Sequence, residues 1–570
     1  MKSLLVTILA LFSFTCLYSQ IYPDKYFVAF TDKNNSPYSI ENPQEYLSAR
    51  AIERRSRYNI PIDIHDLPVN PQYIEAVADI GVQVINPTKW LNGITIYTND
   101  SSLLSEIEAL PFVKSVRKAR QATQAHPKTD FDDDISLFKP SWENETIIDF
   151  SNRTKATGKS TSLQYGLGYN QINQINGIPL HDDGFQGQGM VIAVLDAGFS
   201  YANQLNAFDS LYMNGLIYGT RDIVSGGTNV YQGSFHGTGV LSTMGANLPG
   251  ELIGTAPKAG YYLIRTEDTG SEYLIEEYNW ASGAEFADST GADIINSSLG
   301  YVDFDDPNQN HIYQDMDGNT APATIAADRA MSRGMIVVNS AGNSGNYTSW
   351  PWIGAPADGD SVFTIGAVDA NGIIAGFSSI GPTADGRLKP NVVAQGAATV
   401  IASSNGGTTT SNGTSFSSPI IAGMTACLWQ INQELANMSI LEAIQQSGSY
   451  YNNPNYQYGN GIPDYNQARM VLSAQNKGIA LTPESIKVIP NPFFDKIGIL
   501  FNAIDSQLVT IRMFDITGRL IVSGKFDVQR VGLNYLELTQ LDFIKPGIYT
   551  LTVIAGEKRL NSQKIVKVKD

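Results

Sequence analysis

Four short, mainly apolar runs stand out in the middle of the chain. They cover residues 190–195, 292–295, 335–338 and 362–368, and amphipathic stretches separate them. Continuous Val- and Ile-rich runs of this length are typical of strands buried on both faces, as in parallel sheets covered by helices. The pattern predicts an α/β domain over residues 165–472, with helices on both faces of a parallel sheet.

The residues before this domain follow a different pattern. Residues 26–31 and 93–97 are typical of short strands, whereas residues 43–58 and 70–80 show helical spacing of apolar positions. Together they predict a small α+β domain over residues 21–122. Glutamates interleave with four arginines of the first helical stretch, so we expect a solvated helix face there and not a nucleic-acid patch; the arginines are Arg50, Arg54, Arg55 and Arg57.

Two further regions flank the central domain. Residues 123–164 are polar, contain the acidic run 132–134 and lack sustained periodicity, so we expect a linker that carries a processing site. Residues 483–570 contain alternating apolar positions, which predict a small β-sandwich.

The first 20 residues have the pattern of a secretory signal peptide. A single Lys2 precedes an apolar run over residues 4–17, which is too short to span a membrane. No later segment offers the roughly 18 uninterrupted apolar residues of a membrane helix. We therefore expect an exported protein without a membrane span. Cys16 would leave with the signal peptide, and Cys427 is predicted to be a free, buried thiol in an apolar segment.

Charge is distributed unevenly along the chain. The net charge is −17, and residues 165–470 contain 8 Lys and Arg against 27 Asp and Glu. Residues 477–570 contain 13 Lys and Arg against 9 Asp and Glu, which indicates a domain boundary near residues 473–482. An acidic central domain argues against a nucleic-acid partner, because phosphates would be repelled.

Three polar residues stand at the ends of predicted apolar elements, where sites gather in parallel α/β folds. Asp196 directly follows a predicted strand, and His236 begins a run of small residues. Ser415 precedes an apolar helical stretch, and Pro419 is expected in its first turn. A serine there lies where the helix dipole and free N–H groups stabilise an anion. Each of these residue types alone is more often a turn or cap residue, so only their combination indicates a catalytic site.

Asn343 completes this set from a glycine-rich loop that follows the run 335–338, and its amide can donate toward an oxyanion. Asp196, His236, Asn343 and Ser415, in this order, resemble the subtilisin-like (S8) serine peptidases over about residues 165–468. The order Asp, His, Ser is the one known from subtilisin itself.

The resemblance implies a serine endopeptidase that acts on protein or peptide substrates. His236 would serve as the general base for Ser415, Asp196 would orient the imidazole, and Asn343 with the backbone N–H of Ser415 would hold the oxyanion. A substrate would pair as an added strand with the segment Ser298, Leu299 and Gly300. The chain departs from the family pattern at Ala197, usually Ser or Thr, and at Phe416 and Ser417, more commonly Met and Ala.

The flanking regions carry resemblances of their own. Residues 26–120 resemble the inhibitory and chaperoning propeptide of these peptidases, which implies that the chain's own propeptide is an intramolecular inhibitor. The motifs at 488–493, 514–519 and 546–549 resemble the type IX secretion sorting domain of certain Gram-negative bacteria. That domain implies the type IX secretion machinery as a partner and a location outside the cell or on its surface.

A short acidic loop predicts a second, structural site. Asp315, Asp317 and Asn319 place oxygen ligands two residues apart around Gly318, as in the first half of a calcium loop, although no bidentate Glu follows at the expected distance. Structural calcium is therefore a hypothesis, and the chemistry itself is expected to require no cofactor.

Two other functions compete with the peptidase. One is a catalytically inactive subtilisin-like scaffold that binds proteins at the cell surface. Against it, the chain has all four polar residues of the catalytic pattern. The other is a lipase or esterase of the α/β-hydrolase type. That class needs a Gly-x-Ser-x-Gly motif and a different order of the polar residues, and the sequence has neither.

Overall fold

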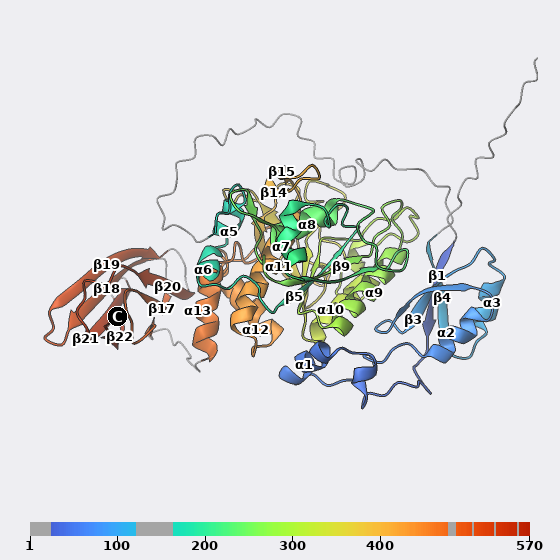
Figure 1. Ribbon diagram of the computed structural model, residues 1–570, viewed down its shortest axis with the longest axis horizontal. Helices are drawn as coiled ribbons and strands as arrows, with labels where there is room; N and C mark the ends of the chain where they lie inside the picture. Colours follow the sequence, from blue (N-terminus) through green and yellow to red (C-terminus); the bar gives the residue numbers. More distant parts are fainter. Residues whose placement is uncertain are drawn as a thin grey trace, which may run out of the picture.

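The computed structural model describes residues 24–120, 163–476, 486–503, 507–528, 532–555 and 558–569. These residues form an N-terminal domain, a central α/β domain and a C-terminal β domain (Figure 1). The predicted signal peptide, most of the predicted linker and Cys16 lie outside the described residues. Within the described ranges, no helix is both long enough and apolar enough to cross a membrane.

The N-terminal domain is a four-stranded antiparallel sheet with two helices against it. The strand order is β2-β3-β1-β4, with β1 at Lys25–Phe30, β2 at Gln83–Thr88, β3 at Gly93–Tyr97 and β4 at Val113–Arg120. Helices α2 (Pro71–Ala78) and α3 (Leu103–Glu108) bury Val77 and Ile107 against the apolar face of the sheet. The α+β prediction is confirmed.

The predicted helix over residues 43–58 is two elements. A 3-10 turn η1 spans Pro43–Glu45, and helix α1 spans Ala49–Arg57. The side chain of Ser48 accepts a hydrogen bond from the backbone N–H of Ala51, so a new N-cap starts α1 inside the predicted stretch. Helix α1 lies apart from the sheet of its own domain and against the central domain (Figure 1).

The core of the central domain is a seven-stranded, fully parallel sheet with the order β13-β12-β11-β10-β5-β9-β6. All four predicted apolar runs are strands of this sheet, and every residue of these strands is buried. The strands are β5 (Val191–Asp196), β6 (Ile217–Asp222), β9 (Gly260–Arg265), β10 (Ile294–Ser297), β11 (Ile336–Ser340), β12 (Phe363–Val368) and β13 (Val392–Gln395).

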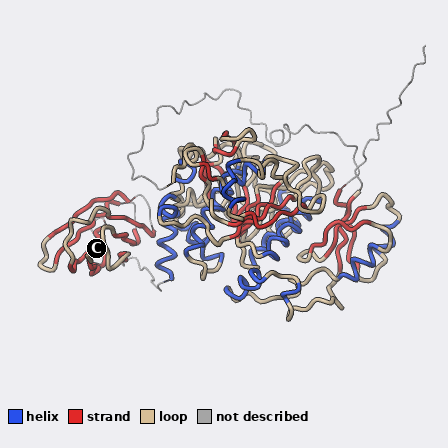
Figure 2. Tube along the Cα trace, in the orientation of Figure 1, coloured by secondary structure: helices blue, strands red, loops and turns tan. Residues whose placement is uncertain are grey.

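Helices cover both faces of this sheet. Helix α8 (His236–Gly245) packs on α11 (Thr414–Ile431), and α9 (Ile275–Thr290) packs on α10 (Pro322–Ser332). Figure 2 shows the central strands enclosed by these helices and by long loops. The smaller elements are α5 (Tyr169–Asn173), α6 (Ile178–Asp182), η3 (Asn206–Phe208), α7 (Asp209–Met213), η4 (Tyr313–Asp315), α12 (Asn437–Gln446), α13 (Tyr465–Asn476) and two hairpins, β7 (Asn247–Leu248) with β8 (Leu252–Ile253) and β14 (Thr399–Ala402) with β15 (Thr408–Ser411).

The C-terminal domain is a sandwich of two antiparallel sheets, as predicted. One sheet has the order β16-β17-β20 and the other β19-β18-β21-β22. Their strands are β16 (Ile486–Ile489), β17 (Ile497–Ala503), β18 (Gln507–Asp515), β19 (Leu520–Val528), β20 (Gly532–Leu538), β21 (Gly547–Ala555) and β22 (Lys558–Lys567). Inward-facing residues such as Ile499 and Ile511 are fully buried and form the core between the sheets.

The solvated face predicted for the arginines of α1 is wrong for Arg54 and Arg55, whereas Arg57 is exposed and pairs with Glu53. Arg54 and Arg55 are only 4% and 1% exposed. Both guanidinium groups bind the carboxylate of Asp288 near the C-terminal end of α9, at 2.6 and 2.9 Å. The sequence showed the glutamates beside these arginines, but their main partner lies in another domain.

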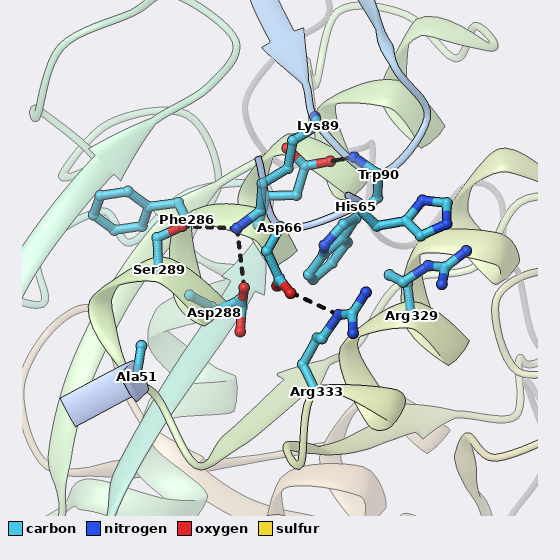
Figure 3. Close-up of polar contacts among 12 residues, drawn as sticks. Ala51, His65, Asp66, Lys89, Trp90, Phe286, Asp288, Ser289, Arg329 and Arg333 are labelled. Carbon is cyan, nitrogen blue, oxygen red and sulfur yellow. Dashed lines mark hydrogen bonds and ion pairs between the residues drawn. The ribbon is translucent and has the colours of Figure 1, made fainter. Parts of the chain in front are cut away.

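Lys89 brings a third cation to the same carboxylate, with its Nζ 3.0 Å from Asp288 (Figure 3). We call Arg54, Arg55, Lys89, Asp66 and Asp288 the charge cluster. Asp66 shares Arg55 and belongs, like the three cations, to the N-terminal domain. The Lys89, Arg55 and Arg54 charges outweigh burial and lower the pKa of Asp288 well below its usual range. The charge cluster therefore fixes the N-terminal domain to one end of α9.

Candidate active site

Asp196 is the last residue of β5, in the interior of the parallel sheet, and its side chain is fully buried. Its Oδ1 accepts hydrogen bonds from the backbone N–H of Ala197 and from Nδ1 of His236, both at 2.8 Å. A carboxylate with a fixed orientation therefore faces the imidazole at the carboxyl edge of the sheet.

His236 is the first residue of α8, and its side chain is 15% exposed. The hydroxyl of Ser234 accepts from the backbone N–H of His236 at 3.0 Å and holds the start of the helix. The next residue must be small, because a Cβ on Gly237 would lie 2.4 Å from the carbonyl oxygen of Gly198 and 2.9 Å from Cβ of Asp196. Gly237 thus lets the helix end approach β5 closely enough for the His–Asp hydrogen bond.

Ser415 is the second residue of α11 and is 9% exposed. Gly413 precedes the helix with a φ of 145°, a conformation that favours glycine and turns the chain sharply into the helix. The ring of Phe416 lies 5.7 Å from the His236 ring, centroid to centroid, so the start of α11 meets the start of α8. The helix N-terminus predicted for Ser415 is confirmed.

Pro419 does not lie in the first turn of α11, as predicted, but is the sixth helical residue. A helical residue normally donates its N–H to the carbonyl four residues earlier, and proline has none. The carbonyl of Ser415 is therefore left without its helical donor, and the hydroxyl of Ser298 donates to it at 2.8 Å. A side chain from another element replaces the missing helix hydrogen bond.

Asn343 follows β11 and reaches the start of α11. Its Oδ1 accepts from the backbone N–H of Thr414 at 2.8 Å and from the Thr414 hydroxyl at 2.9 Å. Because the amide oxygen has these partners, the side chain offers Nδ2 as its donor beside Ser415.

Ser298, Leu299 and Gly300 follow β10 at the same edge of the sheet. The carbonyl of Leu299 accepts from Nδ2 of Asn339 at 3.1 Å, and Gly300 is exposed. The Ser415 hydroxyl also lies 3.4 Å from the carbonyl oxygen of Ser298. The structure thus brings this segment, Asn343 and Ser415 together.

The residues of the predicted calcium loop lie elsewhere, after the segment just described. Asp315 accepts from the backbone N–H of Ile312 at 2.9 Å, and Asp317 accepts from that of Asn319 at 2.8 Å. Both carboxylates thus bind their own loop. Among the described residues, no group of three or more His, Cys, Asp or Glu is arranged to hold a metal ion. The calcium hypothesis rests on sequence spacing alone.

Two residues that support the site were missed in the sequence. Asn296 lies in the buried strand β10; its Nδ2 donates to the Ser298 hydroxyl at 3.2 Å, and its Oδ1 accepts from the Ser418 hydroxyl at 3.0 Å. They form a polar chain behind Ser415. Polar residues inside continuous apolar elements are the only signal that could have revealed them.

Cys427 is fully buried in α11, as predicted, and burial raises the pKa of its thiol. Its Sγ donates to the carbonyl oxygen of Thr255 at 3.1 Å. Such a thiol is a packing residue and not a nucleophile.

Three family models match separate parts of the chain. A peptidase S8 propeptide domain of Bacteroidota matches residues 25–132, the subtilase family matches residues 187–461, and a secretion system C-terminal sorting domain matches residues 487–568. The sorting domain indicates secretion by the type IX system.

Individual subtilisins are similar to the central part. Subtilisin NAT from Bacillus subtilis subsp. natto is 32% identical over 305 residues, which cover 53% of this chain and 70% of that protein. Subtilisin from Bacillus pumilus is also 32% identical over 305 residues and is covered to 96% of its length. Subtilisin DY from Bacillus licheniformis is 30% identical over 294 residues, 50% of this chain and 95% of that protein. The chain therefore belongs to the subtilase family and is a subtilisin-like serine endopeptidase.

Proposed function

We propose that the chain is exported and cleaves proteins through a triad of Asp196, His236 and Ser415, by way of an acyl-enzyme. The observation that carries this proposal is the Asp196–His236 hydrogen bond beside the N-terminus of α11, where Ser415 lies. The order and spacing of the three residues in a subtilase domain support it.

In the proposed reaction, His236 takes the proton of the Ser415 hydroxyl as Oγ attacks the substrate carbonyl carbon. Asp196 holds the imidazole in the tautomer that presents its other nitrogen, and stabilises the imidazolium. His236 then gives the proton to the leaving amine, and water releases the acyl group by the same steps in reverse order. These roles account for every proton transfer without a cofactor.

The tetrahedral intermediate carries a negative oxygen that needs donors. The Nδ2 group of Asn343 and the backbone N–H of Ser415 are the proposed donors. The helix N-terminus adds a favourable dipole, because the first N–H groups of α11 have no helical partner. The peptide ahead of the scissile bond is proposed to pair with Ser298, Leu299 and Gly300 as an added strand.

We also propose that the N-terminal domain is an inhibitor of the same chain until processing removes it. Its buried contacts with α9 support this role, because Lys89 and Trp90 donate their backbone N–H groups to the carboxylate of Glu285 at 2.7 and 2.9 Å. The C-terminal domain is proposed to be the part that the type IX machinery recognises. A structural calcium ion at Asp315, Asp317 and Asn319 stays a prediction, and thermal unfolding with and without a chelator tests it.

The decisive experiment compares casein cleavage and fluorophosphonate labelling of the wild type and Ser415→Ala. We expect both signals in the wild type and neither in the variant. Ser417→Ala is the matched control, because its hydroxyl is also buried in α11 but donates to the Thr414 carbonyl at 3.0 Å. A folded and processed wild type that neither cuts nor labels would favour the inactive binding scaffold.

A further inference from the structure

Arg120 is the last residue of β4, and its side chain is only 2% exposed although it carries a charge. Its Nη1 binds Oδ2 of Asp268 at 2.7 Å, and its guanidinium carbon lies 5.7 Å from the centroid of the Tyr273 ring. An ion pair together with a cation–π contact forms a site shaped for a guanidinium group.

The loop between β9 and α9 surrounds this guanidinium with further acids. Glu267, Asp268 and Glu272 belong to the loop, and Glu276 lies in the first turn of α9. Glu276 is 1% exposed; its Oε1 accepts from the backbone N–H of Asp268, whereas its Oε2 has no hydrogen-bond partner among the described residues. We call these four acids and Tyr273 the acidic pocket.

Electrostatics agree with a pocket built for a cation. Burial and the neighbouring Glu272 and Glu267 raise the pKa of Glu276, so its buried carboxylate lacks sufficient positive charge nearby. Arg120 outweighs burial at Asp268 and lowers the pKa of that carboxyl. Of these acids, Asp268 responds to the guanidinium that enters, and the neighbouring Lys25 of β1 acts in the same direction.

The acidic pocket borders the candidate active site. The backbone N–H of Thr266 donates to the carbonyl of Asp196 at 3.0 Å. The hydroxyl of Tyr301, which directly follows Gly300, donates to Glu267 at 2.8 Å. The loop therefore contacts the triad strand at one end and the predicted peptide-pairing segment at the other.

A second contact holds the backbone that delivers Arg120. The side chain of Gln309 donates to the Lys118 carbonyl at 3.4 Å and accepts from the backbone N–H of Leu274 at 3.0 Å. The end of β4 thus lies as an extended strand between two loops of the central domain, one of which contacts the candidate site. An extended substrate that bound in the same direction would place the residues that precede its scissile bond at the acidic pocket.

The pocket is distinct from the charge cluster. Glu276 and Asp288 lie twelve residues apart on α9, about 18 Å along the helix axis. In parallel α/β folds the helix N-terminus lies at the carboxyl edge of the sheet, where sites gather. The charge cluster lies at the other end of α9, whereas the acidic pocket lies beside the candidate active site.

We propose that the acidic pocket is a specificity subsite for an arginine or lysine side chain of the substrate, several residues ahead of the scissile bond, which Arg120 fills before processing. This inference rests on the proposed peptidase function and names a substrate class for it. Arginine fits better than lysine, because its planar guanidinium can bind Asp268 and stack on Tyr273 at the same time.

The test uses the enzyme after processing has removed the N-terminal domain, together with quenched fluorescent peptides. The peptides share one sequence, in which a single arginine replaces glutamine at each position from the third to the eighth before the scissile bond. We expect one or two positions at which arginine raises kcat/KM about tenfold over glutamine, with lysine intermediate. The same ratio is measured for Asp268→Asn and for the control Glu442→Gln, an exposed acid on α12.

The inference requires that Asp268→Asn reduce the arginine-to-glutamine ratio severalfold, mainly through KM, while Glu442→Gln retains it. Wild-type cleavage with equal rates at all positions would overturn the subsite and leave the peptidase intact. An arginine preference that persists in Asp268→Asn would overturn it too, since general attraction by the acidic domain would then explain the preference. If no peptide is cut and Ser415 is not labelled, the peptidase proposal fails first.

Discussion

Two buried ionic groups of this molecule have similar parts but different properties. Asp196 meets one histidine, a group that can gain and lose a proton near neutral pH, at the carboxyl edge of the sheet. Asp288 meets two arginines and a lysine, Arg54, Arg55 and Lys89, at the far end of α9. In the first pair the histidine is proposed to carry a proton during the reaction, whereas the second group holds two domains together. The difference lies in the partner residue and not in the carboxylate.

Removing the charge of Asp196 should break the first group most severely. In Asp196→Asn, we expect kcat to fall by about four orders of magnitude, because the amide favours the wrong imidazole tautomer. Peptide hydrolysis by processed enzyme measures the effect. Asp209→Asn, an exposed acid in the first turn of α7, should retain wild-type kcat. A loss below tenfold for Asp196→Asn would remove the aspartate from the proposed triad.

Removing the charge of Asp288 should break the second group and spare the chemistry. Asp288→Asn leaves three cations buried without their shared carboxylate, and we expect about 3–5 kcal/mol less stability of the docked state. Urea unfolding of the uncleaved chain, kept intact by Ser415→Ala, measures this loss. The control Glu53→Gln breaks an exposed pair with Arg57 and should cost about 1 kcal/mol or less. Equal losses in the two variants would contradict the role of the charge cluster.

Removing the Asn343 amide tests whether this residue stabilises the negative oxygen of the intermediate or only positions the start of α11. We expect Asn343→Ala to lower kcat by about a hundred- to a thousandfold with little change in KM, a magnitude known from subtilisin itself. Thr414→Val removes a hydroxyl that donates to the Asn343 oxygen and accepts from the backbone N–H of Gly342, but it keeps the Asn343 donor, so its effect should be much smaller. If both variants lose activity equally, Asn343 supports the helix start and does not hold the oxyanion.

The smallest predicted effect is a loss of folding stability at low pH. The pKa of Asp288 is lowered in the folded chain, so its contribution to stability is complete above the ordinary aspartate pKa, near 4, and is lost as pH falls below it. We expect wild type to lose at most about 1.4 kcal/mol per pH unit through this group below pH 4. Asp288→Asn should lack this component, so the stability difference between the two proteins should shrink in acid. A constant difference down to pH 2 would contradict the assignment.

The fold was predictable where one physical rule dominates. Strands β5, β10, β11 and β12 are buried on both faces, so their mainly apolar sequences are visible without a partner. Edge strand β6 (Ile217–Asp222) has only one buried residue. Such a strand produces no pattern that a single sequence can separate from a loop.

The site was predictable for a related reason. Asp196, His236 and Ser415 stand at element ends beside glycines, and local sequence records such turns. Asn296 and Arg54 depend instead on partners far away in the sequence, 122 residues for Asn296 with Ser418 and 234 residues for Arg54 with Asp288. Only the folded chain reveals what these side chains contact, which is why α1 was expected to face solvent.

Pro419 has a consequence for how the site tolerates motion. An ordinary serine near a helix start would be anchored by the turn that follows it, so fraying of that turn would release it. Here the anchor of the Ser415 carbonyl is the side chain of Ser298, in the segment proposed to pair with substrate. We therefore expect a peptide bound to this segment to displace the backbone of Ser415, the proposed nucleophile, whenever it displaces Ser298.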